Sequence, residues 1–190
     1  MHDHSNSHLD PRSPLVVDAG QLPRQPGAMR TVERVVSAPK DLGQTLIKVA
    51  EGTDLWLDLR LESVTEGVLV TGRLTGTAVG ECGRCLRPIE TEVDAPLQEL
   101  FAYPDSTTDA TTDEDEIGRL HGDLIDLEPA VRDAVVLALP ATPLCRPDCP
   151  GLCPECGAHW DELPADHRHQ QLDPRWAALR KLAVTEETEE

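Results

Sequence analysis

The sequence predicts an α+β protein, in which an antiparallel β-rich domain with a packed helix is followed by a small C-terminal zinc-binding segment and a short helix. Three observations support this prediction. Leucines occupy every second position over 55–61 and alternate with charged residues, with Trp56 as the exception, as in a half-buried strand. Apolar residues with helical spacing occupy 126–139. Four cysteines then cluster among prolines and glycines over 145–156, as in a metal-binding segment.

The composition divides the chain into successive segments. Prolines among polar residues predict an extended arm over 1–28, with one short apolar run at 15–17 that has the pattern of a strand. The β-rich domain is expected over 29–140. The cysteine-rich segment and its helix are expected over 141–184, and residues 185–190 form an acidic tail.

Further strands are expected after the leucine-rich one. The run 68–79 has the pattern of a second strand, in which Gly72 and Gly76 suggest bulges or bends. The segment 89–93 alternates again and predicts a third strand that pairs back on the second. The simplest topology for these strands is an antiparallel meander.

Acidic and helical segments follow the strands. Residues 104–116 contain several carboxylates and no basic residue, so a solvated loop is expected there. The helix over 126–139 has Asp126 as its expected cap and Pro129 in its first turn, and its apolar content predicts that it is largely buried. Near the C-terminus, Asp173 is placed to cap the short helix.

Charge limits the classes of partner. The formal net charge is -18, which opposes direct binding to a phosphate backbone. A local basic patch could still contact a partner, and Arg84, Arg87 and Arg175 are the candidate contact residues. The first residues lack the apolar stretch of a secretory signal, and no apolar run is long enough to cross a bilayer. We therefore expect a cytoplasmic protein whose thiols are reduced and available as ligands.

The four clustered cysteines predict a structural zinc site formed by Cys145, Cys149, Cys153 and Cys156. Tetrahedral zinc needs tight turns that direct several thiolates toward one centre, and the short spacers rich in proline and glycine allow such turns.

Two other ligand sets are open. Cys82 and Cys85 form a second Cys-x-x-Cys pair, which could share one ion with the pair Cys153 and Cys156. His167 and His169 could instead complete a Cys₂His₂ set with that later pair, although their spacing is closer than usual.

No recognisable catalytic motif is present, so the protein is expected not to be an enzyme. An alternative is a cytoplasmic thiol oxidoreductase that uses Cys82 and Cys85. In thioredoxin-like sites such a pair opens a helix, whereas a strand pattern follows here. A second alternative is a zinc metallochaperone that uses the Cys-x-x-Cys pairs, which would hold its metal weakly.

Taken together, several motifs resemble the YceD family of large ribosomal RNA subunit accumulation proteins, in its actinobacterial form. The motifs are the first Cys-x-x-Cys pair after a β-rich half, a helix start after Ile125, the later cysteines, and an Asp-Pro-Arg motif at Asp173.

The resemblance implies a ribosome-biogenesis factor that supports synthesis, processing or accumulation of 23S rRNA, with no established enzymatic activity. Many relatives carry Cys-x-Cys where this chain has His167 and His169, which makes these histidines credible ligands of a second or a shared ion. Because the chain is acidic, the expected partner is a basic large-subunit ribosomal protein or a pre-ribosomal particle, with any contact to 23S rRNA possible through that partner.

Overall fold

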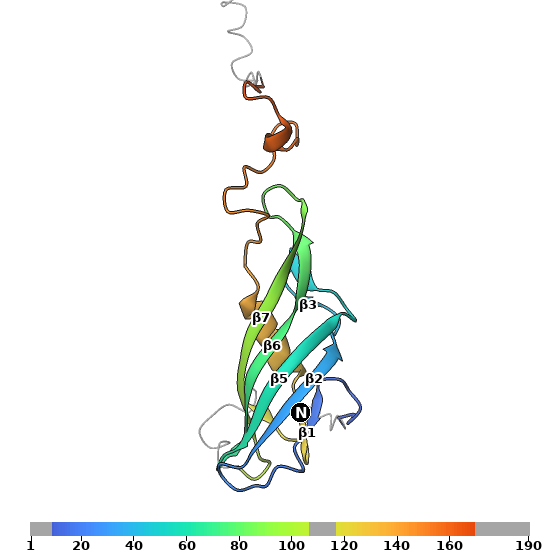
Figure 1. The fold of residues 1–190 in the computed structure, drawn as a ribbon, viewed down its shortest axis with the longest axis vertical. Coiled ribbons are helices and arrows are strands. Elements are labelled where there is room, and N and C mark those ends of the chain that lie inside the picture. Colours follow the sequence, from blue (N-terminus) through green and yellow to red (C-terminus); the bar gives the residue numbers. More distant parts are fainter. Residues whose placement is uncertain (1–8, 107–116, 170–190) are drawn as a thin grey trace, which may run out of the picture. The chain divides into compact units, whose positions relative to one another are not determined.

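The computed structural model describes residues 9–106 and 117–169 (Figure 1). The chain forms two compact units, Met1–Cys149 and Pro150–Glu190, which are described separately below. The predicted helix after Asp173, the acidic tail and most of the predicted acidic loop lie outside the described residues.

The first unit is built around a mostly antiparallel sheet of seven strands. Its strands are β2 (Met29–Ser37), β3 (Leu42–Gly43), β4 (Ile47–Val49), β5 (Asp54–Ser63), β6 (Gly67–Glu81), β7 (Pro88–Ala102) and β8 (Gly118–Arg119). The long strand β6 pairs with β5 and then β4 along one edge, and with β7 along the other. β2 continues the sheet beyond β5, and β8 is parallel to β7. The predicted meander is therefore confirmed as β5, β6 and β7.

The predicted leucine strand is confirmed in β5. Leu55, Leu57, Leu59 and Leu61 are all buried, and Trp56 between them is half exposed. Successive side chains of a strand point to opposite faces, so the leucines contribute one face of β5 to the core. The core is completed by aliphatic residues of the neighbouring strands and of the helix.

Gly72 and Gly76 do not mark bulges, because the register of β6 with β7 runs through both without interruption, and the register with β5 runs through Gly72. Their role is close packing. A Cβ on Gly72 would collide with the carbonyl oxygen of Asp58, and one on Gly76 would lie 2.7 Å from Cδ2 of Leu55. The absence of a side chain at both positions lets β5 approach β6.

The N-terminal arm contributes to the first unit. The predicted short strand is present as β1 (Val16–Asp18), which pairs with β9 (Leu124–Asp126) in a separate two-stranded sheet. Leu15, Val17 and Leu22 are buried in the common core. This part of the expected extended arm is thus packed, because its apolar side chains find partners far along the chain.

The helix α1 (Glu128–Ala138) begins later than predicted, because Asp126 belongs to β9 and Leu127 is the N-cap. The Asp126 carboxylate still accepts a hydrogen bond from the N–H of Glu128 over 2.9 Å. α1 packs against β7 and β3 and covers one face of the sheet (Figure 1). The expectation of a largely buried helix was wrong: Val131 and Val135 are buried, whereas Leu137 is 85% exposed.

The second unit is small and built mainly from turns. An isolated bridge pairs Leu152 with His159, and a single 3-10 turn follows at η2 (Trp160–Glu162). Among the described residues of both units, no helix is long and apolar enough to cross a membrane.

Candidate metal centres

The cysteines and two of the histidines form two groups of four potential ligands. The first group is Cys82, Cys85, Cys145 and Cys149, and the second is Cys153, Cys156, His167 and His169. Within each group, the ligand atoms lie within 4.8 Å of one another. Each group could therefore hold a metal ion.

The first pair of ligands lies in the turn that joins β6 to β7. The backbone N–H of Cys82 donates to the carbonyl of Arg87, and the N–H of Leu86 donates to the carbonyl of Cys82, both over 2.9 Å. These two hydrogen bonds close a tight loop in which Cys85 lies opposite Cys82. Leu86 adopts a φ of 60°, in the left-handed region that favours glycine.

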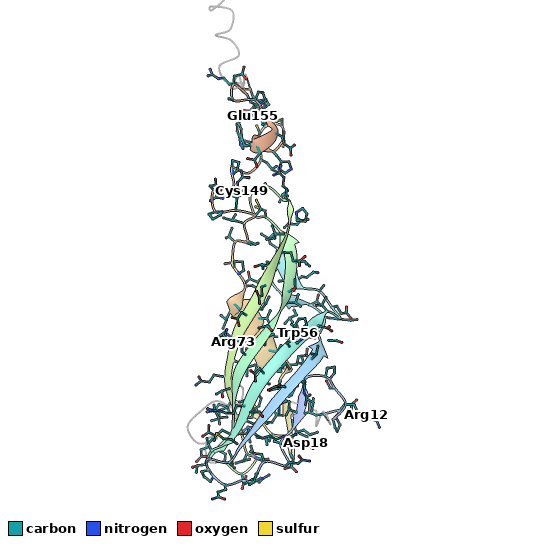
Figure 2. The ribbon with its side chains drawn as sticks, viewed as in Figure 1. Arg12, Asp18, Trp56, Arg73, Cys149 and Glu155 are labelled. Atoms are coloured by element: carbon teal, nitrogen blue, oxygen red, sulfur yellow. The ribbon has the colours of Figure 1, made fainter. Side chains whose placement is uncertain are left out.

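The second pair of ligands follows α1, which returns the chain to the turn between β6 and β7. The N–H of Gly83 donates to the carbonyl of Pro143 over 2.8 Å. The Arg84 guanidinium donates to the carbonyl of Cys149 over 3.0 Å. These contacts hold the segment of Cys145 and Cys149 beside the first pair, and Figure 2 shows Cys149 at this end of the two long strands.

The sulfur geometry of the first group fits a tetrahedral ion. The sulfur of Cys82 lies 3.8 Å from that of Cys149, and the sulfur of Cys85 lies 3.6 Å from that of Cys145. Four thiolates bound tetrahedrally at the usual Zn–S length would have sulfurs separated by about 3.8 Å. These separations are much longer than a disulfide bond, and all the cysteines are free.

The protonation of the first group favours a cation. Burial raises the pKa of the Cys82 thiol, but hydrogen bonds from the backbone of Cys145, Arg84 and Cys85 outweigh burial and lower the pKa to about 6. The pKa of Cys145 is raised to about 12, by its hydrogen bond with the Cys149 side chain and by burial. Because the charge of one thiolate disfavours ionisation of the next, a divalent cation bound between them would stabilise several thiolates together.

The second group begins with a turn of the same design. The N–H of Cys153 donates to the carbonyl of Ala158, and the N–H of Gly157 donates to the carbonyl of Cys153, both over 2.8 Å. Gly157 has a φ of 71°. Hydrogen bonds from the backbone of Cys156 and Glu155 lower the pKa of Cys153 to about 6.

The two histidines complete the second group. Nε2 of His169 lies 3.3 Å from the sulfur of Cys153, and Nε2 of His167 lies 3.7 Å from the sulfur of Cys156. A tetrahedral ion with ordinary Zn–S and Zn–N bonds would separate such atoms by about 3.6 Å. The close spacing of the two histidines in the sequence is therefore compatible with a shared ion.

Glu155 is a residue of this site that the sequence reasoning missed. Its Oε2 lies 3.4 Å from Nδ1 of His169, on the opposite side of the ring from the nitrogen that faces Cys153. A carboxylate in this position orients a metal-binding histidine and fixes its tautomer. The position of Glu155 inside the second Cys-x-x-Cys pair is the sequence signal that could have indicated it. Trp160 packs edge-on against His167, with 5.6 Å between the ring centroids.

The grouping differs from the compact Cys₄ set expected from the spacing. Cys145 and Cys149 lie with the distant Cys82 and Cys85, and Cys153 and Cys156 lie with the two histidines. The Cys₂His₂ alternative matches the second group, whereas the two Cys-x-x-Cys pairs are in separate groups. The sequence analysis did not predict that Cys145 and Cys149 would combine with Cys82 and Cys85.

The three candidate contact arginines have different environments. Arg84 hydrogen-bonds the carbonyl of Cys149 and so supports the first group. Arg87 lies in the same turn, directly before β7. Its backbone carbonyl accepts a hydrogen bond from the backbone N–H of Cys82. Arg175 lies outside the described residues.

A family model described as large ribosomal RNA subunit accumulation protein YceD matches residues 70–183. The chain belongs to the YceD family. The matched region of this YceD-family chain begins within β6 and includes α1 and both groups of ligands.

Relatives of this YceD-family chain are found in several bacteria. An uncharacterised protein of Mycobacterium tuberculosis strain H37Rv is 55% identical over 170 residues, which cover 90% of this chain and 82% of the relative. An uncharacterised protein of Mycobacterium leprae is 45% identical, over 90% of this chain and 78% of the relative. The uncharacterised protein YlbN of Bacillus subtilis is 29% identical over 57% of this chain and 62% of the relative. No solved structure matches the chain.

Proposed function

We propose that this chain is a non-enzymatic ribosome-biogenesis factor that supports synthesis, processing or accumulation of 23S rRNA. The observation that carries the proposal is the match to the YceD family, whose description names accumulation of the large ribosomal RNA subunit. The proposed place of action is the cytoplasm, where bacterial ribosomes are assembled.

Zinc is the proposed ion for both groups. Thiolate and imidazole ligands in tetrahedral arrangement suit zinc better than harder cations. Four protein ligands would close the coordination shell, which supports a structural role, because catalytic zinc keeps one position for water or substrate. Cys82 and Cys85 are 0% and 3% exposed, which favours a ligand role over disulfide exchange with another protein.

The proposed partner is a basic large-subunit ribosomal protein or a pre-ribosomal particle. The net charge of -18 opposes direct attraction to RNA and favours a basic protein as the first contact. Arg84, Arg87 and Arg175 remain the proposed residues for contact with this partner.

Depletion of the protein in its own host tests the function. We expect the ratio of 23S to 16S rRNA to fall, large subunits to decrease in sucrose gradients, and both to recover when the wild-type chain is supplied. A variant with Arg84→Ala and Arg87→Ala should restore 23S rRNA less well than the wild type at equal protein level. An unchanged 23S rRNA level and subunit profile after complete depletion would refute the ribosomal role.

A further inference from the structure

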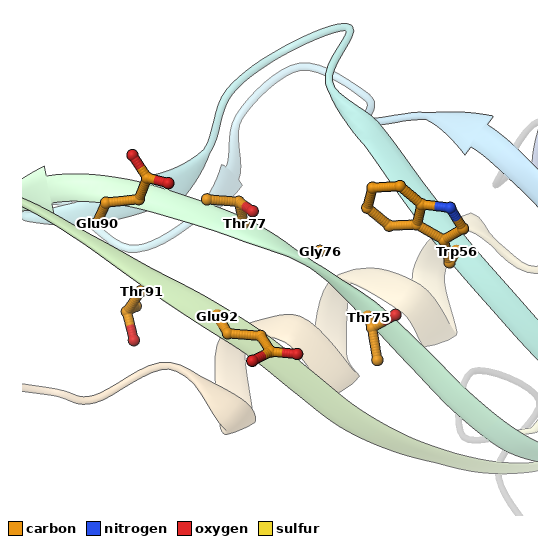
Figure 3. Close-up of a pocket in the computed structure, with 7 residues that line it drawn as sticks. All are labelled: Trp56, Thr75, Gly76, Thr77, Glu90, Thr91 and Glu92. Carbon is orange, nitrogen blue, oxygen red and sulfur yellow. The ribbon is translucent and has the colours of Figure 1, made fainter.

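One face of the main sheet is open to solvent, and a tryptophan lies at its centre. α1 covers the opposite face (Figures 1 and 3). On the open face, Val35, Trp56 and Thr75 are cross-strand neighbours in β2, β5 and β6. Val35 is 53% exposed and Trp56 is 50% exposed. A half-exposed tryptophan beside an exposed aliphatic residue is typical of a surface that binds a partner.

Two shallow hollows flank Trp56. One has a volume of about 430 Å³ and lies between Trp56 and the carboxylates of Glu90 and Glu92 (Figure 3). The other has a volume of about 620 Å³, and its charged lining residues are Glu33, Asp58, Arg34 and Arg73. The guanidinium of Arg34 donates to the carbonyls of Pro14 and Val16, and that of Arg73 pairs with Asp94. Each hollow therefore combines Trp56 with two carboxylates, and the arginines of the second hollow are already engaged elsewhere.

The open face is acidic. Its carboxylates belong to Glu33, Asp54, Asp58, Glu62, Glu90, Glu92 and Asp94, and its cations belong to Lys48, Arg60 and Arg73. Both arginines are engaged within the face: Arg60 pairs with Glu62 over 3.5 Å, and Arg73 pairs with Asp94. In the described part of the chain, the other carboxylates of this face have no ion pair.

We infer that the open face, with Trp56 at its centre, binds a basic segment of another protein. Arginine and lysine side chains are attracted both to carboxylates and to the face of an indole ring. Each of the two hollows beside Trp56 places carboxylates near the indole ring. A cationic side chain that enters either hollow therefore contacts the ring and the carboxylates together. The face thus complements an extended segment with several basic residues.

Charge decides between this occupant and two others. The phosphates of a nucleic acid would be repelled by the unpaired carboxylates. A second copy of this face would bring two acidic surfaces together, which costs free energy.

The inference narrows the class of partner proposed above, but it depends on the composition of the face and not on the ribosomal role. A direct binding measurement therefore tests it independently of the 23S rRNA measurement.

The test uses the full chain and a synthetic peptide of nine arginines as the probe. The chain has three tryptophans, so Trp160→Phe and Trp176→Phe make Trp56 the reporter of fluorescence. We expect a saturable change in Trp56 emission on titration with the peptide at physiological salt. In a parallel assay with a labelled peptide, Trp56→Thr should raise the dissociation constant at least tenfold. Threonine is suited to a strand, so the sheet should be preserved.

Charge variants separate local binding from general attraction to an acidic protein. Glu33→Lys with Glu92→Lys changes one carboxylate in each hollow and should also raise the dissociation constant at least tenfold. The matched control is Asp105→Lys with Asp166→Lys, which makes the same change in net charge at exposed turn positions that do not belong to the strands of this sheet. The control should change the dissociation constant less than twofold.

Three outcomes would overturn the inference. The first is a control variant that weakens binding as much as the face variant. The second is a Trp56 emission that does not change while the peptide saturates the protein. The third is a Trp56 signal that responds to single-stranded RNA, or to protein concentration alone, more strongly than to the basic peptide.

Discussion

Leu86 and Gly157 occupy the same position in two turns of the same design. Each follows the second cysteine of a Cys-x-x-Cys pair, and each N–H donates to the carbonyl of the first cysteine. Their φ values are 60° and 71°. The backbone requirement is thus the same in both turns, although one position has a leucine and the other a glycine.

Adding a side chain at Gly157 and removing the side chain at Leu86 should have opposite effects on the stability of the two turns. Gly157→Ala is expected to destabilise the second group by about 1 kcal/mol, because a Cβ in left-handed backbone is unfavourable even where the space is open. Leu86→Gly should relieve similar strain, with part of the gain offset by the added freedom of the unfolded chain. Zinc affinity by competition with a chelator is the measurement. A loss of affinity in Leu86→Gly comparable to that in Gly157→Ala would show that the exposed leucine side chain, and not the backbone, governs this turn.

The zinc-loaded protein should contain two ions, which native mass spectrometry can count. Cys82→Ser should remove one ion and Cys153→Ser the other, because the two residues belong to different groups. His4→Gln, in the N-terminal arm, is the control and should retain both ions. A single ion that is lost equally from Cys145→Ser and Cys153→Ser would instead favour the compact set predicted from the sequence.

Glu155→Gln should weaken zinc binding at the second group by roughly 10–100-fold, because it removes the carboxylate that orients His169. Binding at the first group should not change. The matched control is Asp166→Asn, which neutralises an exposed carboxylate of the same unit. Equal affinities for Glu155→Gln and the control would contradict the orienting role.

The contribution of Glu99 to the free energy of unfolding should fall as the pH rises through the acidic range. Burial, together with the negative charge of Asp133, raises the pKa of Glu99 above its ordinary value of 4.5. The folded state therefore holds this proton more tightly than the unfolded state, so the favourable contribution is complete below the ordinary pKa and is lost as the pH rises through the raised pKa.

Glu99→Gln should accordingly raise the melting temperature at pH 7.5 by about 1–2 °C, and the difference should disappear near pH 4. Differential scanning calorimetry at the two pH values is the measurement. Glu90→Gln, on the open face, serves as the control. A stabilisation by Glu99→Gln that is the same at both pH values would show that the charge of Glu99 is not its cause.

The strands of the meander could be predicted because their signal is local. Leu55, Leu57, Leu59 and Leu61 occupy every second position, and this spacing produces a strand with one buried face wherever a partner sheet exists. β2 was not predicted, because only Val32 and Val36 among its residues are buried apolar side chains. Its strand conformation depends on pairing with β5, which is a tertiary contact.

The start of α1 shows a similar limit. Asp126 has the residue type of an N-cap, and its carboxylate does accept the N–H of Glu128. Pairing of β9 with β1 nevertheless keeps Asp126 in a strand, so the cap moves to Leu127. A partner from the N-terminal arm thus overrode the local preference for an earlier helix start.

The sequence by itself determined the chemistry of the candidate metal centres: the residue types and the two tight Cys-x-x-Cys turns. These features depend on neighbours within a few residues. Only the tertiary structure decided which ligands meet. Cys82 and Cys149 are 67 positions apart in the chain, and their sulfurs lie within 3.8 Å because α1 packs on the sheet and returns the chain to the turn between β6 and β7. Spacing along the sequence favoured neighbouring cysteines, whereas the distance in space is determined by the length of the two strands and the path of the helix.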